Sequence, residues 1–453
     1  MSKILIANRG EIARRIIRAC RAVNLPSVAV HSEADADLPF VSEADERVAI
    51  GPSPARESYL DPARILHAAA KTGATAIHPG YGFLAENAGF AEAVMDAGVT
   101  WIGPSPDTIR AMGDKGRARG IAEAAGVPVV PGSQRFADGQ TAGIADAAEA
   151  VGYPLLVKAS AGGGGIGMQR VDTPEALEKT VGATQSMAQK AFGDGTVFLE
   201  RFIPTARHVE VQVFGYGDGT GLHLFERDCS LQRRYQKVIE EAPAPGLSAA
   251  TRLRMTDAAL ALVAATQYAG AGTVEFILDV ATEEFFFLEM NTRIQVEHPV
   301  TEMITGRDLV AMQISLALGH GERLAQSDIA VNGASVECRL YAENPAKKFF
   351  PSPGKLTTLR LPPEDGTLRI ETAYAEGNAI TPYYDPLIAK IIAHGEDRGA
   401  AIARAVAALR ATEVEGPATN RDFLIACLGH PDFAAGRVHT GFIDAELPAL
   451  VPK

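Results

Sequence analysis

The first thirty residues alternate between strand and helix patterns, and this alternation constrains the fold more than any other feature. Residues 3–7 (Lys-Ile-Leu-Ile-Ala) predict a buried strand, and Asn8-Arg9-Gly10 predicts a turn. Apolar residues at helical spacing predict a helix over 11–23, and the next strand is predicted over 26–30. Strand, helix and strand in this order predict a right-handed parallel α/β unit.

The same alternation continues along the chain and sets the predicted domain boundaries. A first α/β domain over residues 1–113 is completed by helices over 61–71 and 86–97 and strands over 74–77 and 99–102. A second domain is predicted over 114–325 and a third over 332–447, in which strands precede helices.

The predicted second domain contains a smaller unit of its own. The domain opens with a helix that ends at Ala125, followed by a short strand over Val127–Val130. A compact lid unit is predicted over about 131–203. We expect several strands and two helices in residues 204–325.

Composition excludes several classes of protein. A chain of 453 residues is too long for one hydrophobic core, and 47% apolar with 22% charged residues is typical of a soluble globular protein. The net charge of −12 argues against general nucleic-acid or membrane-surface binding. Four scattered cysteines without a CxxC pair predict reduced thiols in the cytoplasm and neither disulfides nor a zinc site. We find neither a signal-peptide pattern nor a membrane-length apolar run.

Polar side chains alternate with apolar or small ones along residues 289–297. In extended backbone a period of two places them all on one face. The segment directly before, Phe285-Phe286-Phe287-Leu288, should be core. Because polar groups beside a core strand need partners, the alternation indicates a site rather than a solvated edge strand. The alternating polar residues are Glu289, Asn291, Arg293, Gln295 and Glu297.

A hairpin precedes and includes the start of this segment. Strand patterns over Val274–Leu278 and Glu284–Met290 flank a short turn, so Glu275 is predicted to lie opposite Glu289. Facing carboxylates repel each other unless a cation lies between them. With the oxygen of Asn291 they suit Mg²⁺ held jointly with nucleotide phosphates. The alternative is a solvated carboxylate pair bridged by a nearby Arg or Lys.

A glycine-rich loop follows Lys158, with glycines at 162–165 and at 167. Glycines allow backbone N–H groups to approach a phosphate, and Lys158 could pair with a phosphate oxygen. The loop is not a P-loop, because no Gly-Lys-Ser/Thr follows and a strand rather than a helix comes next. The alternative is a flexible surface loop.

Two further segments each allow two interpretations. The run 227–237 is basic in an acidic protein, so it is either a solvated charged strand or a means to hold Arg233 and Lys237 near an anion. His208 is either a core histidine or a contact to a ribose hydroxyl.

The segment 78–87, His-Pro-Gly-Tyr-Gly-Phe-Leu-Ala-Glu-Asn, forms a loop into a helix. Tyr81 and Asn87 are candidate ligand contacts. The alternative is a structural turn that the domain needs in order to fold.

These motifs, in this order and spacing, resemble the biotin carboxylase family of the ATP-grasp superfamily. The resemblance extends from Lys3 to about Leu447. It is carried by residues 7–13 (Ala-Asn-Arg-Gly-Glu-Ile-Ala), His78–Asn87, Lys158–Met168, Glu226–Pro243, Glu289–Pro299, Glu337–Leu340 and Pro351–Gly354.

The resemblance implies both a fold and a reaction. The fold is an α/β and α+β multidomain protein: a Rossmann-like N-terminal (pre-ATP-grasp) domain, an ATP-grasp domain and a C-terminal biotin carboxylase domain. In the reaction, ATP activates bicarbonate as carboxyphosphate, and N1 of biotin on a carrier protein is then carboxylated. ADP and phosphate are the other products, and Mg²⁺ or Mn²⁺ is required.

The resemblance also implies roles for the matching residues. ATP would be bound by Lys115, Lys158, Gly162, Gly163, Gly164, Gly165, Gly167, Met168, Glu200, Ile203, His208, Gln232, Glu275 and Glu289. The metal would be bound by Glu275, Glu289 and Asn291. Bicarbonate and biotin would be bound by Lys237, Arg293, Gln295, Val296, Tyr81 and Arg339. The catalytic set would be Glu297 as the general base, Arg339 to steady the biotin enolate, Lys237 and Arg293. The matching family residues after about Asn291 lie in a loop, so the resemblance implies that the strict alternation ends near Asn291.

The sequence departs from the family pattern at two positions. Ile166 stands where most members carry Arg or Lys, and Tyr235 stands where a histidine is usual. The first removes a cation near the phosphates, and the second puts a ribose contact in doubt. Ile166 together with Ala-Glu-Asn-Pro at 342–345 is more similar to the urea carboxylase branch.

Partners are expected on other chains. No Ala-Met-Lys-Met biotinylation segment occurs, and no region the size of a carboxyltransferase follows Lys453. We therefore expect a separate biotin carboxyl carrier protein and separate carboxyltransferase subunits. Acetyl-CoA carboxylase, in fatty acid biosynthesis, is the enzyme that such a subunit most often serves, and the resemblance implies a homodimer.

Other functions remain as alternatives. The same half-reaction could serve a urea, propionyl-CoA or other acyl-CoA carboxylase. Another ATP-grasp ligase, of the carbamoyl-phosphate or amino-acid type, would share the nucleotide and metal residues. It would not need Glu337-Cys338-Arg339 or the 78–87 loop. A non-catalytic nucleotide sensor would have lost a metal ligand or the base, and neither is lost.

Overall fold

A computed structural model describes residues 2–160, 167–234 and 236–451. The N-terminal region is a parallel five-stranded sheet with strand order β3-β2-β1-β4-β5, which confirms the predicted α/β unit. Its strands are β1 (Ile4–Ile6), β2 (Ser27–Ser32), β3 (Glu46–Gly51), β4 (Ala76–His78) and β5 (Thr100–Trp101). Its helices are α1 (Gly10–Ala22), α2 (Pro39–Glu43), α3 (Pro62–Thr72), α4 (Ala88–Asp96) and α5 (Pro106–Gly113).

Local chemistry determines where these helices begin and end. The Asp61 carboxylate accepts two backbone N–H groups at the start of α3, and Gly73, with φ of 66°, ends that helix in the left-handed region. Asn87 accepts the backbone N–H of Phe90 and thereby caps α4. Asn87 is exposed, and its side chain caps the helix. For Asn87 the structure therefore supports a structural turn rather than a ligand contact.

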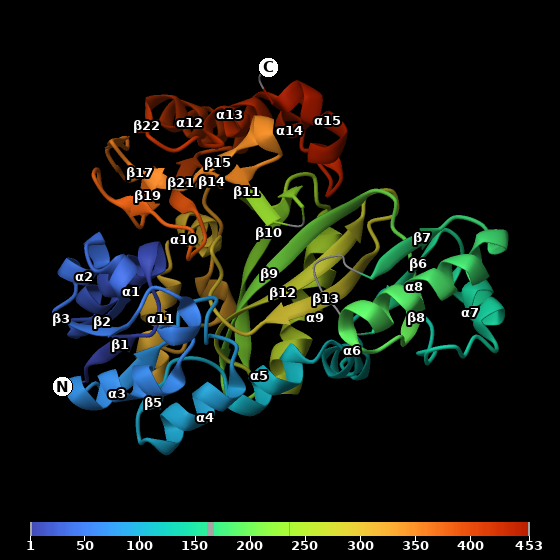
Figure 1. The fold of residues 1–453 in the computed structure, drawn as a ribbon, viewed down its shortest axis with the longest axis horizontal. Helices are drawn as coiled ribbons and strands as arrows, with labels where there is room; N and C mark the ends of the chain where they lie inside the picture. The colour runs from blue at the N-terminus through green and yellow to red at the C-terminus, as the bar shows by residue number, and fades with distance from the viewer. Residues whose placement is uncertain (1, 161–166, 235, 452–453) are drawn as a thin grey trace.

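An eight-stranded antiparallel sheet forms the centre of the molecule, with strand order β13-β12-β9-β10-β11-β14-β21-β19 (Figure 1). The sheet is continuous through β11 and β14, so it joins the predicted second and third domains. Its strands are β9 (Ala206–Tyr216), β10 (Gly221–Arg233), β11 (Gln236–Ala242), β12 (Ala269–Asp279), β13 (Phe285–Asn291), β14 (Ala334–Tyr341), β19 (Leu368–Thr372) and β21 (Leu387–Gly395).

Four helices lie around this sheet: α6 (Lys115–Ala124), α9 (Ala249–Thr266), α10 (His298–Thr305) and α11 (Leu309–Ala317). Three of them fall within residues 204–325, where we predicted two. The helices α10 and α11 are only eight and nine residues long, and α10 follows directly on the polar segment 289–297. Short helices beside polar segments give a weak periodic signal.

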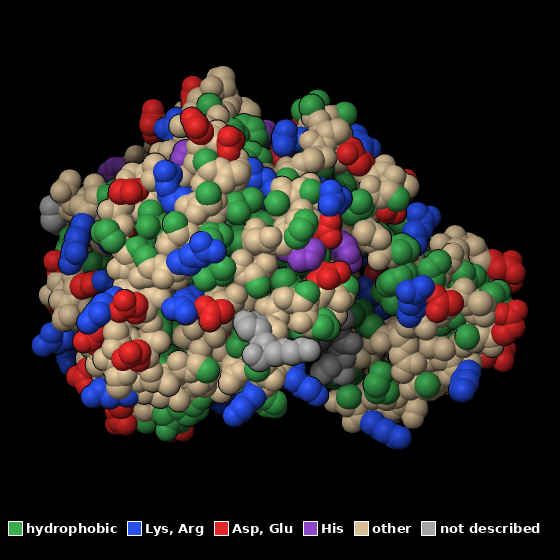
Figure 2. Space-filling model, turned by 90° about the horizontal axis from the view of Figure 1, so that it is seen from above, with side chains coloured by type: hydrophobic (Ala, Val, Ile, Leu, Met, Phe, Trp, Pro, Cys, Tyr) green, Lys and Arg blue, Asp and Glu red, His purple; other side chains and the backbone are tan. Residues whose placement is uncertain are grey.

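The lid is a separate small unit with its own apolar core. A three-stranded antiparallel sheet of order β7-β6-β8 is covered by two helices, and the unit stands away from the body of the molecule (Figures 1 and 2). Its elements are α7 (Ile144–Val151), β6 (Leu155–Ala159), β7 (Met168–Val171), α8 (Leu177–Phe192) and β8 (Val197–Arg201). On the face shown in Figure 2, basic and acidic side chains are interspersed.

The C-terminal region adds helices and short strand pairs to the central sheet. The helices are α12 (Arg398–Ala411), α13 (Arg421–Gly429), α14 (Pro431–Ala434) and α15 (Phe442–Leu450). The short strands are β15 (Glu343–Asn344), β16 (Phe350–Pro351), β17 (Gly354–Lys355), β18 (Thr358–Arg360), β20 (Ala379–Ile380) and β22 (Glu413–Glu415). The described part of the chain also contains five 3-10 helices: η1 (Glu33–Asp35), η2 (Ala55–Glu57), η3 (Pro174–Ala176), η4 (Gln326–Asp328) and η5 (Pro345–Lys347).

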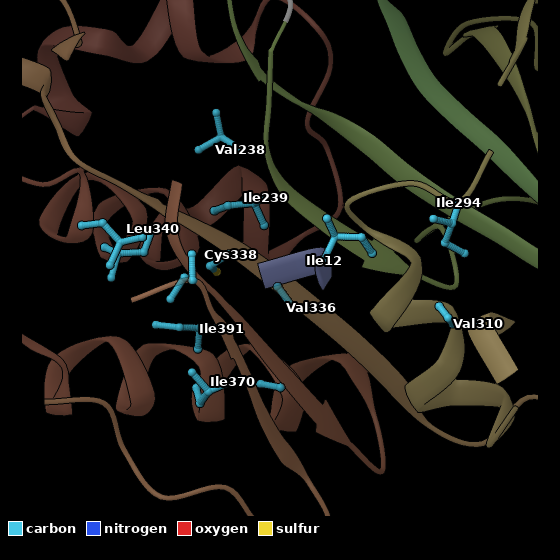
Figure 3. Close-up of a cluster of buried hydrophobic side chains, with 14 of the residues drawn as sticks. Ile12, Val238, Ile239, Ile294, Val310, Val336, Cys338, Leu340, Ile370 and Ile391 are labelled. Carbon is cyan, nitrogen blue, oxygen red and sulfur yellow. The ribbon is translucent and has the colours of Figure 1, made fainter. Parts of the chain in front are cut away.

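Side chains of strand β14 alternate between an apolar face and a polar face of the central sheet. Val336, Cys338 and Leu340 point into a large apolar cluster with residues of neighbouring elements such as Ile391 (Figure 3). The alternate positions therefore carry polar groups on the opposite face, even though the whole strand is buried. That face is where the site described below is built.

Two local predictions were wrong. Val127–Val130 is not a strand but makes a single bridge, between Val129 and Phe287. Pro128 within the segment and Pro131 directly after it have no backbone N–H, so the segment cannot donate the hydrogen bonds of a longer strand. Leu288, expected in the core, is 39% exposed. Among the described residues, no helix combines the length and apolar character that crossing a membrane requires.

The core beneath the central sheet gives a stability prediction. Phe276 on β12 is fully buried and meets Phe285 edge to face, with ring centroids 5.3 Å apart. We expect Phe276→Ala to lower the free energy of unfolding by about 3–5 kcal/mol, measured by urea denaturation. Leu253→Ala is the control, because Leu253 is 60% exposed. Equal losses in the two variants would contradict this view of the core.

Candidate active site

A cavity of about 830 Å³ lies between the lid, the central sheet and the C-terminal region. Its walls bring together side chains from segments that are far apart in the sequence. Most of the predicted site residues line it: Lys115, Lys158, Met168, Glu200, His208, Gln232, Lys237, Glu275, Glu289, Asn291, Arg293, Gln295, Val296, Glu297 and Arg339.

Glu275 and Glu289 lie opposite each other on β12 and β13, which confirms the predicted hairpin register. Glu275 Oε1 accepts hydrogen bonds from Asn291 Nδ2 at 2.9 Å and from Gln295 Nε2 at 2.8 Å. Burial and the nearby Glu275 raise the pKa of Glu289. A divalent cation would relieve this repulsion, and the oxygen donors of the pair suit Mg²⁺ or Mn²⁺.

Lys237 lines the cavity and lies among three carboxylates. Its Nζ is 2.6 Å from Glu210 Oε2, 2.9 Å from Glu275 Oε1 and 2.6 Å from Glu297 Oε1. Burial lowers the pKa of Lys237, but the three carboxylates outweigh burial and hold the pKa well above its usual range. Lys237 therefore stays a cation. The run 227–237 is not a solvated strand, and its other candidate, Arg233, pairs with Glu343 outside the cavity lining.

Glu297 is a buried carboxylate held between two cations. It lies just before α10, with 2% exposure, and it accepts hydrogen bonds from Lys237 and from Arg339 Nη2 at 3.0 Å. Burial raises the pKa of Glu297, but Lys237 and Arg339 outweigh burial and hold the pKa below its usual range. A deprotonated carboxylate beside two cations can take a proton from an anion that those cations bind.

Arg339 connects Glu297 to a second buried carboxylate. Its Nη2 lies 2.5 Å from Glu240 Oε1 on the neighbouring strand β11. Burial raises the pKa of Glu240 to about 7, although Arg339 acts to lower it. Arg339 thus carries charge on the side of the cavity away from the Glu275–Glu289 pair.

Arg293 is anchored by the N-terminal region. Its Nε donates to Glu86 Oε2 at 2.9 Å, and its Nη2 donates to Asn291 Oδ1 at 2.8 Å. Glu86 comes from the 78–87 loop, so this loop orients a cavity arginine from a distance of 207 residues along the chain. Only one further contact, from Nη1 to the Ile294 carbonyl at 3.2 Å, engages the guanidinium among the described residues.

The lid end of the cavity holds the predicted nucleotide residues. Lys158 on β6 forms an ion pair with Glu200 on β8. His208 is not a core histidine, because it lines the cavity. Its Nδ1 is 2.8 Å from Gln232 Nε2 and its Nε2 is 2.9 Å from Glu275 Oε2. His208 therefore links the nucleotide end to the carboxylate pair.

Three described residues that the family resemblance assigned to the site do not line the cavity. Tyr81 donates its hydroxyl to Glu11, and Ile203 lies in a small apolar cluster with Phe286. Gly167 has φ of 88° at the start of β7, a conformation that favours glycine. Six residues named in the sequence predictions lie outside the described residues: Gly162, Gly163, Gly164, Gly165, Ile166 and Tyr235.

The alternation over 289–297 ends at Asn291, as the family resemblance implied. Strand β13 ends there, and residues 292–297 form turns before α10. Gln295 folds back onto Glu275, and Lys390 Nζ holds the Val296 carbonyl at 2.8 Å. The polar groups reach one cavity through a buried loop rather than from one strand face.

Sequence reasoning missed several residues of the site. Glu210 and Gln212 lie on β9 with Arg227 beside them on β10, and all three are fully buried. The alternation of Glu210 and Gln212 with Val209, Val211 and Val213 could have revealed them, because it repeats the pattern that pointed to Glu289. Other missed residues are Glu86, Glu240, Tyr341 and Asp385.

Comparison with known families gives matches over nearly the whole chain. Residues 1–109 match "Biotin carboxylase, N-terminal domain", and residues 337–445 match "Biotin carboxylase C-terminal domain". Residues 114–326 match "Carbamoyl-phosphate synthase L chain, ATP binding domain".

Individual relatives agree with these matches. Biotin carboxylase 2 of Bacillus subtilis is 50% identical, over 98% of this chain and 100% of that protein. The mitochondrial methylcrotonoyl-CoA carboxylase subunit alpha of Glycine max is 48% identical over 98% of this chain, which spans only 60% of that protein.

Among solved structures, a similar one is the biotin carboxylase domain dimer of Hydrogenobacter thermophilus 2-oxoglutarate carboxylase with MgADP and bicarbonate. The TM-score is 0.90 at 42% identity, over 100% of this chain and 99% of that one.

Proposed function

The chain belongs to the biotin carboxylase family, and from this membership we propose how its cavity performs the reaction. The protein is an ATP-dependent ligase in which bicarbonate carboxylates biotin, with ADP and phosphate as products. One observation carries the assignment of roles: Glu297 lies between Lys237 and Arg339 in the cavity that also holds the Glu275–Glu289 pair.

Bicarbonate is held by Lys237, Arg293 and the amide of Gln295. A guanidinium offers a planar fork of donors that matches the anion. Glu297 takes the bicarbonate proton, and a bicarbonate oxygen attacks the terminal phosphorus of ATP. ADP leaves and carboxyphosphate forms, while Lys115 and the other cavity lysines neutralise the developing charge.

Biotin meets carboxyphosphate on the Arg339 side of the cavity. Carboxyphosphate breaks down to CO₂ and phosphate. The released phosphate takes the proton of biotin N1, and the N1 of the resulting enolate attacks CO₂ to form carboxybiotin. The guanidinium of Arg339 steadies the enolate that forms on the biotin ring. Glu240 on β11 and Glu297 just before α10 both contact that guanidinium, so it is oriented before biotin arrives.

A divalent cation would be held by Glu275, Glu289 and Asn291, and it supplies positive charge next to the phosphate oxygens. We expect Glu289→Gln to raise the Mg²⁺ concentration for half-maximal turnover by at least about tenfold, because a direct carboxylate ligand is lost. Mn²⁺ binding, followed by water-proton relaxation, should weaken in parallel. Glu284→Gln on the same hairpin is the control, since Glu284 is 57% exposed. Unchanged Mn²⁺ binding in Glu289→Gln would contradict the metal assignment.

We propose further that the protein acts in the cytoplasm as a homodimer with a separate carrier protein and carboxyltransferase subunits. The dimer of the Hydrogenobacter domain and the full-length match to a Bacillus biotin carboxylase support this proposal. Acetyl-CoA is the acceptor that we propose for the complete system. A urea or another acyl-CoA, as in the methylcrotonoyl-CoA carboxylase relative, is the alternative.

The acceptor can be tested by reconstitution. The purified protein is combined with biotinylated carrier and with transferase subunits for either acetyl-CoA or methylcrotonoyl-CoA. Malonyl-CoA formation with the acetyl-CoA components is the expected result. Carboxylation only with the other components would assign the second acceptor.

A further inference from the structure

Arg227 on β10 is fully buried, and all five of its N–H donors are used. Its partners lie on three other elements and in the loop before α10. Nε donates to Glu210 Oε1 at 2.6 Å. Nη1 donates to Gln212 Oε1 at 2.7 Å and to Thr301 Oγ1 at 2.9 Å. Nη2 donates to Thr273 Oγ1 at 3.1 Å and to Gln295 Oε1 at 2.6 Å. No donor is left for a substrate, so Arg227 can act on the reaction only through its partners.

The contact with Gln295 decides which end of that amide faces the cavity. Arg227 binds the amide oxygen, so the NH₂ group is turned away from it and donates to Glu275 at 2.8 Å. Gln295 lines the cavity. An amide oxygen turned toward an anion would repel it, whereas the NH₂ group attracts it. Arg227 thereby makes Gln295 a donor for an anion.

The contact with Glu210 acts on Lys237. Glu210 uses Oε1 for Arg227 and Oε2 for Lys237, so one buried carboxylate links two cations. Without Arg227 the whole charge of Glu210 would act on Lys237 and draw the ammonium away from the other cavity groups. Arg227 also adds positive charge near Glu297.

We infer that Arg227 is a positioning residue for bicarbonate: it orients the Gln295 amide and, through Glu210, fixes Lys237. This inference rests on the proposed function, because it assigns Gln295 and Lys237 to the same anion. Removing Arg227 should therefore weaken bicarbonate use more than ATP use.

The test compares Arg227→Lys and Arg227→Met with the wild type. We expect the KM for bicarbonate to rise about tenfold or more in both variants, since hydrogen bonds to a charged group are lost, while the KM for ATP changes less than about twofold. Lysine keeps the charge and methionine does not. The acid limb of the pH profile for bicarbonate should therefore move to higher pH in Arg227→Met only, because Glu297 loses a neighbouring cation.

Arg398→Met is the matched control. Arg398 makes four hydrogen bonds, two of them to the buried Glu241 on the strand that carries Lys237, but it does not line the cavity. We expect it to lose stability and to keep the wild-type KM for bicarbonate.

The inference is overturned if the KM for bicarbonate of the Arg227 variants stays at the wild-type value. It is also overturned if this KM rises by no more than the KM for ATP of the same variants, or by no more than the KM for bicarbonate of Arg398→Met. Failure of both Arg227 variants to fold would equally overturn it, in favour of a purely structural role. A wild-type protein without bicarbonate-dependent turnover would instead overturn the proposed function, and the role of Arg227 with it.

Discussion

Glu297→Gln should bind ATP as the wild type does and lose biotin carboxylation by about 10²- to 10⁴-fold, the usual effect of removing a general base. Glutamine has the same shape, so the contacts with Lys237 and Arg339 can be kept in part. Glutamine cannot accept the proton of bicarbonate, so the step that starts the reaction fails. Bicarbonate-dependent ATP hydrolysis in the absence of biotin should fall by a similar factor.

Glu302→Gln is the matched control for this experiment. Glu302 lies on α10, only five residues further along, and is also buried between two arginines, but it does not line the cavity. The control should keep the wild-type turnover of its folded fraction. If Glu297→Gln carboxylates biotin at a near-normal rate, Glu297 is not the base.

Arg339→Ser should separate the two half-steps. We expect biotin carboxylation to fall by about 10²- to 10³-fold, because a preoriented cation is lost where the enolate charge develops. Slow bicarbonate-dependent ATP hydrolysis without biotin should persist, in contrast to Glu297→Gln. The measurement is ADP release with and without biotin, beside carboxybiotin formation.

Arg398→Ser serves as the control for Arg339→Ser. Like Arg339→Ser, this substitution removes a guanidinium that pairs with a buried carboxylate. The carboxylate is Glu241, the neighbour of Glu240 on β11. A thermal melt shows the fraction of each variant that is folded. If Arg339→Ser loses biotin-independent ATP hydrolysis as completely as Glu297→Gln does, the separate role of Arg339 on the biotin side is wrong.

The metal end of the site could be predicted from sequence because its geometry is local. The short turn at 279–283 permits one simple pairing of its flanking strands, and that pairing places Glu275 opposite Glu289 as found. The same period of two ends at Asn291, where the chain leaves the sheet. The family resemblance implied this end, whereas the pattern of polar residues alone did not. A polar alternation in sequence reports extended backbone only while a neighbouring strand continues to pair with it.

The rest of the site depends on contacts between distant segments. Glu86 reaches Arg293 from the first domain, and Lys390 holds the Val296 carbonyl from the third. Their partners are set by how the domains meet, which local periodicity does not encode. The family resemblance supplied Arg339 as a site residue, and the basic run 227–237 had already pointed to Lys237. Their buried partners Glu240 and Glu210 were named only once the structure was known.

The most direct test of the central claim follows labelled carbon from bicarbonate. The wild-type protein is incubated with ATP, Mg²⁺, free biotin and isotopically labelled bicarbonate, and acid-labile label on biotin is measured against ADP formed. We predict label on biotin that requires ATP and disappears in Glu297→Gln while ATP still binds. ATP consumption that is independent of bicarbonate, or label that reaches an amine such as ammonia and never biotin, would contradict the assignment of this cavity as the meeting point of ATP, bicarbonate and biotin.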